Sequence, residues 1–93
     1  MAMFIVRVEL PDANYSDYQA LYDLMEGYGF SKQITGDNGV VYDLPDAEYY
    51  CNGDYDIEAV SSTAFQVAQS VRANAKVLVT ETERIRWTGL VYY

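Results

Sequence analysis

The side chains best suited to chemistry in this chain are two arginines and a tryptophan near its C-terminal end. Arg84 and Arg86 are two positions apart, so an extended backbone directs both guanidinium groups to the same side. Trp87 follows directly, and a guanidinium pair beside an aromatic ring can hold a phosphate group and a stacked base. The alternative interpretation is charge balance against Glu81 and Glu83. The full set of predicted RNA-binding residues is Arg7, Lys76, Arg84, Arg86 and Trp87.

The absence of histidine limits the chemistry that this chain can perform. The sequence contains no histidine, which excludes Ser-His-Asp and Cys-His catalysis, histidine-based nuclease chemistry and most zinc sites. Any enzymatic step must use carboxylates, tyrosine, lysine or arginine. Glu9 and Asp12 flank the end of the first expected strand, where carboxylates could hold a divalent metal ion. Their spacing fits a solvated loop instead. We therefore expect neither a metal site nor a cofactor, and the catalytic residues stay unassigned.

A single cysteine, Cys51, excludes an internal disulfide. A free cysteine is usually a small, buried strand residue, and it indicates a reducing cytoplasm. No apolar run approaches the roughly 20 residues that span a bilayer, and no basic region precedes the apolar residues of the N-terminus. We therefore expect a soluble cytoplasmic protein without a membrane partner.

The chain is strongly acidic. Its 14 acidic and 6 basic residues give a net charge of −8. Such a charge keeps a small protein soluble and opposes general nucleic-acid binding, because affinity for phosphate comes from Lys and Arg. RNA contact therefore requires a local basic patch on an acidic body. The same acidic surface favours a basic protein partner.

The length predicts a single domain over residues 1–93. Within it, residues 3–10 alternate with a period of two, which places Phe4, Val6 and Val8 on one face of a strand. That face is purely apolar, so we expect it to lie against the helices.

Two segments show the spacing of amphipathic helices. The first covers residues 15–28, with Asn14 or Ser16 as its N-cap and Gly29 as its C-terminal stop. Its apolar stripe consists of Tyr18, Leu21, Leu24, Met25 and Tyr28. The second helix follows Asp56, which we expect to be its N-cap, and its buried stripe consists of Ile57, Val60, Ala64, Val67 or Ala68, and Val71.

The remaining segments read as strands. Residues 30–35 begin a second strand, and residues 36–39 form a strong turn signal before the short apolar run 40–42. The second strand could pair with residues 40–42 or with residues 47–51, and we favour the latter as the main ladder. Residues 76–82 form a further strand, and the chain ends in an extended segment, residues 84–93.

This order predicts an α+β domain of ferredoxin-like βαββαβ topology. It has a four-stranded antiparallel sheet, two helices on one face and an extended C-terminal segment. The other sheet face carries Met3, Ile5 and Leu78, which are more apolar than a solvated face requires. We expect a second copy of the chain to cover this open face as a homodimer, or the C-terminal segment to fold over it.

Scattered positions between residues 4 and 71 give the chain a likeness to a known family. They are Phe4, Ile5, Val6, Arg7, Val8, Pro11, Tyr15, Ser16, Leu24, Met25, Gly29, Phe30, Ser31, Ile34, Asp37, Gly39, Leu44, Pro45 and Tyr49. In these positions the chain resembles the GhoS family of type V antitoxins, which is also similar in fold to the CRISPR-associated Cas2 nucleases. Ala20 and Tyr22 stand where the family member compared has arginines, so no catalytic residue is transferred.

The resemblance implies an endoribonuclease that neutralises a membrane-acting toxin by cutting the toxin's mRNA. Without histidine, such cleavage needs a metal-held water or an arginine-stabilised attack of the 2′-hydroxyl. The alternative is a non-enzymatic acidic interaction module that works as a homodimer or on a basic protein. A small-molecule sensor that uses the open sheet face is a third hypothesis.

Overall fold

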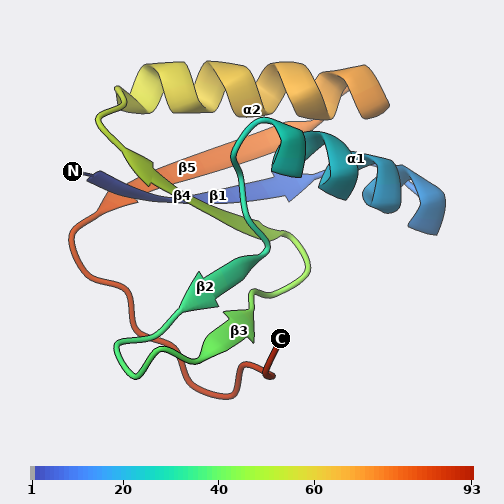
Figure 1. Cartoon of the computed structure of the whole chain (residues 1–93). Coiled ribbons are helices and arrows are strands. Elements are labelled where there is room, and N and C mark those ends of the chain that lie inside the picture. Colours follow the sequence, from blue (N-terminus) through green and yellow to red (C-terminus); the bar gives the residue numbers. More distant parts are fainter. Residues whose placement is uncertain (1) are drawn as a thin grey trace.

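The computed structural model describes residues 2–93, and Met1 lies outside the described residues. Two helices cover one face of an antiparallel sheet, and a small hairpin and the C-terminal segment lie on the other side (Figure 1). The elements are β1 (Ala2–Glu9), α1 (Tyr15–Gly27), β2 (Gln33–Thr35), β3 (Val41–Asp43), β4 (Glu48–Gly53), α2 (Ile57–Val71) and β5 (Lys76–Thr82).

Both helices begin at the residues that the sequence predicts. The side chain of Asn14 accepts a hydrogen bond from the Asp17 N–H at 2.9 Å, and the Asp17 carboxylate accepts one from the Asn14 N–H at 3.2 Å. This capping box satisfies two backbone donors at the start of α1. Asp56 accepts from the Glu58 N–H at 3.3 Å and caps α2 by this single bond. Gly29, with a φ of 91°, terminates α1 as expected.

The core lies between the central strand and the two helices. Phe4, Val6 and Val8 have no exposed surface, and they pack in one cluster with residues of both helices such as Met25 and Ala64. The predicted apolar face of β1 is therefore confirmed. The predicted stripe of α1 is wrong at two positions, because Leu24 and Tyr28 are exposed. Leu24 points away from the core, and Tyr28 follows the last helical turn.

The four-stranded sheet of the prediction is not what forms. The main sheet has three strands in the order β4-β1-β5, all antiparallel, and β2 pairs with β3 in a separate two-stranded sheet. The prediction had a continuous ladder between the second strand and residues 47–51. In residues 2–93, these two segments share one isolated bridge, between Ser31 and Tyr50. The turn at residues 36–39 explains the difference, because the Gly36 N–H reaches the Val40 carbonyl at 2.9 Å and closes a short local hairpin.

The C-terminal segment, residues 84–93, pairs with the hairpin instead of folding flat over the open sheet face. The Asp43 N–H donates to the Val91 carbonyl at 2.9 Å, and the Tyr93 N–H donates to the Val41 carbonyl at 3.0 Å. The Trp87 ring lies edge-on to the Tyr42 ring, with centroids 5.5 Å apart. These contacts hold the segment beside β3, and Figure 1 shows the backbone of the segment running there.

Replacing Trp87 by alanine should loosen the C-terminal segment while leaving the main sheet folded. A half-buried ring of this size contributes roughly 1–3 kcal/mol, and its contact with Tyr42 is lost. Amide exchange at Asp43 and Tyr93, which bond across this pairing, should accelerate by roughly tenfold or more in hydrogen–deuterium exchange by NMR. Tyr55→Ala, which removes an exposed ring between β4 and α2, is the control. Equal protection in the Trp87 variant and the wild type would contradict this arrangement.

Candidate functional site

Three of the predicted RNA-binding residues gather around one hollow of about 650 Å³. Met3 and Tyr50, on the open face of the main sheet, border it on one side. The hairpin turn and the first part of the C-terminal segment border it on the other sides. We call this the arginine hollow, and its lining residues are Met3, Ile34, Thr35, Gly36, Asp37, Tyr50, Glu83, Arg84, Ile85, Arg86 and Trp87.

Arg7 and Lys76, the other two predicted residues, do not line this hollow. Arg7 lies on the open face and contacts the carboxylates of Glu9 at 3.4 Å and Glu48 at 3.5 Å. Lys76 begins β5, exposed to solvent and opposite Glu9 in the strand register. The structure therefore does not join the five residues into one continuous patch.

In the described residues 2–93, the two arginines of the hollow form no intramolecular ion pair. Within residues 2–93, no carboxylate lies within 4.0 Å of the guanidinium of Arg84 or Arg86. Direct pairing with Glu81 or Glu83, the alternative interpretation of these arginines, is thus not observed. Two carboxylates, Asp37 and Glu83, line the same hollow. The arrangement offers an anion two guanidinium groups, with proton acceptors and aromatic rings beside them.

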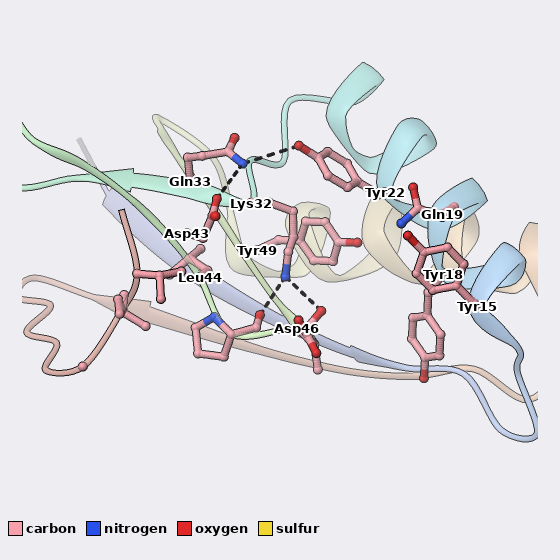
Figure 2. A pocket seen from close by; sticks show the side chains of 15 residues that line it. Tyr15, Tyr18, Gln19, Tyr22, Lys32, Gln33, Asp43, Leu44, Asp46 and Tyr49 are labelled. Carbon is pink, nitrogen blue, oxygen red and sulfur yellow. Dashed lines mark hydrogen bonds between the residues drawn. The ribbon is translucent and has the colours of Figure 1, made fainter. Parts of the chain in front are cut away.

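A second, larger cavity of about 790 Å³ was not predicted. It lies between α1, the β3–β4 connection and the C-terminal segment, and Figure 2 shows its lining. Four tyrosines surround it, so we call it the tyrosine cleft: Tyr15, Tyr18, Tyr22 and Tyr49. The first three recur at positions i, i+3 and i+7, and this helical spacing is the signal that could have revealed the cleft.

Lys32 is the cationic side chain of the tyrosine cleft, and its ammonium is fully hydrogen-bonded. It donates to the carbonyl oxygens of Pro45 at 2.7 Å, Asp46 at 2.9 Å and Glu48 at 3.1 Å. Its nitrogen also lies 5.1 Å from the centre of the Tyr49 ring. Burial lowers the pKa of Lys32, while Asp46, Asp43 and Glu48 act in the opposite direction. An ammonium has three protons, so Lys32 has none left for a ligand.

Hydrogen bonds fix the orientation of two further rings in the cleft. The Tyr18 hydroxyl accepts from the Leu10 N–H at 3.1 Å. The Gln33 amide donates to the Tyr22 hydroxyl at 3.4 Å and to the Asp43 carboxylate at 3.2 Å, as Figure 2 shows. These rings are positioned before any ligand arrives, which lowers the entropy cost of binding.

Two buried groups have raised pKa values. Burial raises the pKa of Tyr49 to about 12, with smaller contributions from Tyr22 and Tyr18. Burial also raises the pKa of the Cys51 thiol to about 11, which is opposite to the activation of a nucleophile. Cys51 is buried in β4, as its predicted role as a small strand residue requires.

Comparison with known proteins does not identify a family. No family model matches the chain, and no curated protein is detectably similar to it. The resemblance to the GhoS-type antitoxins therefore stays a prediction. Among residues 2–93, neither α1 nor α2 has the length and hydrophobicity of a membrane-spanning segment. Residues 2–93 also contain no cluster of three or more Cys, Asp or Glu side chains that could hold a metal ion.

Replacing Tyr49 by phenylalanine should protect the fold in alkali. Because the folded-state pKa of Tyr49 is raised from 10.0 to about 12, its contribution to stability is complete below pH 10 and is lost as the pH rises towards 12. Tyr49 is buried, and a shift of this size corresponds to roughly 2–3 kcal/mol. The wild type should therefore lose more stability over this range than Tyr49→Phe, in urea unfolding at a series of pH values.

Tyr92→Phe is the matched control for this titration, because Tyr92 is exposed. Its stability should follow that of the wild type through the alkaline range. Parallel loss of stability in the wild type and in Tyr49→Phe would show that the titration of Tyr49 does not cause the alkaline loss of stability.

Proposed function

We propose that this chain is a GhoS-like cytoplasmic antitoxin that binds toxin mRNA in the arginine hollow and cuts it. The observation that supports this best is that Arg84 and Arg86 line one hollow with Trp87, and that neither guanidinium group is ion-paired within residues 2–93. The lining also contains Asp37 and Glu83, so its net charge is zero, and RNA contact rests on the two guanidinium groups themselves.

The hollow suits a single-stranded segment of RNA. Arg84 and Arg86 can hold one phosphate group through charge-assisted hydrogen bonds. Trp87 and Tyr50 offer rings on which unpaired bases can stack, and stacking contributes roughly 1–3 kcal/mol per base. A double helix is a poorer ligand, because its bases are already stacked on one another.

Cleavage can proceed without histidine if the arginines stabilise the charge that develops on the phosphate. The 2′-hydroxyl oxygen attacks the adjacent phosphorus, and its proton passes to the carboxylate of Glu83 or Asp37. The bond from phosphorus to the 5′-oxygen breaks, and that oxygen takes a proton from water, whose hydroxide recovers the proton held by the carboxylic acid. The products are a 2′,3′-cyclic phosphate and a 5′-hydroxyl, and the reaction requires no Mg²⁺.

The double variant Arg84→Ala/Arg86→Ala tests this function with purified protein and single-stranded RNA. Loss of two phosphate contacts should weaken RNA binding by roughly tenfold or more at low salt, and should abolish cutting. Binding is measured by fluorescence anisotropy, and the ends of the RNA are analysed for cyclic phosphate. Lys76→Ala, which removes a positive charge outside the hollow, is the control.

Absence of cutting by the clean wild-type protein, with or without Mg²⁺, would remove the endoribonuclease proposal. Cutting that requires Mg²⁺ and leaves 5′-phosphate ends would instead support a metal-held water as the nucleophile. If the double variant binds RNA as tightly as the wild type does, the arginine hollow is not the site.

The second candidate function is a non-enzymatic interaction module, which the open sheet face favours. Leu78 is 65% exposed on that face opposite Arg7, and Met3 and Ile5, further along β1 on the same face, are only half-buried. An apolar surface of this kind fits a second copy of the chain, and a net charge of −8 fits a basic protein partner.

A homodimer through the open face should depend on Leu78. Light scattering should give twice the monomer mass for the wild type and the monomer mass for Leu78→Lys, because the added charge would be buried in the interface. Leu24→Lys, at an exposed position of α1 on the helical side, is the control and should stay dimeric. A wild-type protein that is monomeric at high concentration would contradict the homodimer.

A further inference from the structure

We propose that the tyrosine cleft binds a basic peptide segment of a protein partner, holding an arginine or lysine side chain among its rings and carboxylates. This inference rests on the second candidate function, the interaction module, and is independent of RNA cutting. The cleft and the arginine hollow have different lining residues, so the two activities can be tested separately.

The charge around the cleft favours a cation. Three carboxylates act on the Lys32 ammonium, namely those of Asp43, Asp46 and Glu48. Glu48 is paired with Arg7. The charges that line the cleft are therefore those of Lys32, Asp43 and Asp46, with a net charge of −1. An incoming guanidinium or ammonium group lowers this excess, whereas a phosphate group increases it.

The cleft already stabilises one cation by contacts that a peptide could extend. The Lys32 ammonium lies over the Tyr49 ring and is bonded to three carbonyl oxygens. Since its protons are all engaged, Lys32 cannot bind a carboxylate or phosphate of a ligand. Tyr15 is more exposed than the other three tyrosines of the cleft, and the Asp46 carboxylate is exposed as well. Both are available to a second cation at the rim of the cleft.

The aromatic lining distinguishes this cleft from a simple acidic surface. Tyr18 and Tyr22 are oriented by their hydrogen bonds, and Figure 2 shows Tyr15 and Tyr18 on α1 beside the cleft. An arginine side chain can stack on such rings with its guanidinium plane while its stem contacts apolar groups. Leu90 and Val91, from the C-terminal segment, add apolar lining for that stem.

The test uses the full chain and a rhodamine-labelled peptide of alternating arginine and glycine. Fluorescence anisotropy at low salt should show saturable binding, and a peptide with glutamate in place of arginine should not bind. Asp46→Asn and Tyr15→Ala should each weaken binding by roughly three- to tenfold, as expected for one carboxylate or one ring in contact with a cation. Both side chains are exposed, so neither change should unfold the protein.

Matched controls separate the cleft from general charge attraction. Glu58→Gln removes one carboxylate on α2, and Tyr28→Ala removes one exposed ring at the far end of α1; each should change the affinity by less than about twofold. Amide resonances of Tyr22 and Lys32 should shift when the peptide is added.

Three outcomes would overturn the proposal. The first is no saturable binding of the arginine peptide, and the second is equal weakening by Asp46→Asn and Glu58→Gln. The third is displacement of the peptide by single-stranded RNA in the Arg84→Ala/Arg86→Ala variant, which would make the cleft a nucleic-acid site. Peptide binding that persists in this variant supports the proposal even if RNA cutting is absent.

Discussion

Closure of the hairpin at residues 36–39 is the constraint on which both cavities depend. Because the Gly36 N–H bonds to the Val40 carbonyl, β2 turns back onto β3 and leaves the main sheet after one bridge, Ser31 to Tyr50. The C-terminal segment then pairs with β3. The arginine hollow opens between the hairpin and the open sheet face, and the tyrosine cleft opens between the hairpin and α1. A continuous four-stranded sheet would contain neither cavity in this form.

The distribution of the few cations follows from the same arrangement. Arg7 contacts Glu9 and Glu48, Arg72 contacts Asp17 and the Pro11 carbonyl, and Lys32 is bonded to three carbonyls. These three cations tie elements of the chain together. In the described residues, Arg84 and Arg86 are the cations left without such bonds in a cavity. Both cavities carry two carboxylates, so they differ in their cations: Arg84 and Arg86 line one, and the fully bonded Lys32 lines the other.

Residue type and short-range spacing were sufficient for the central strand, the helices and their caps. The alternation of Phe4, Val6 and Val8 fixes which face of β1 is buried, because a strand places alternate side chains on opposite sides. Asn14 and Asp56 fix the helix starts through contacts with residues two or three positions away. The closeness of Arg84, Arg86 and Trp87 is likewise local in the sequence.

The sequence by itself therefore determined the α+β class, the buried face of β1 and one compact cluster of candidate residues, since each depends on neighbours within a few positions. Only the tertiary structure decided the partner of β2, because two competing strands were compatible with the same pattern and the nearer one closes the shorter loop. It alone separated Arg7 and Lys76 from the arginine hollow and brought Lys32 to the Pro45 carbonyl. Contacts between distant segments arise from packing, and the periodicity of a short segment does not predict them.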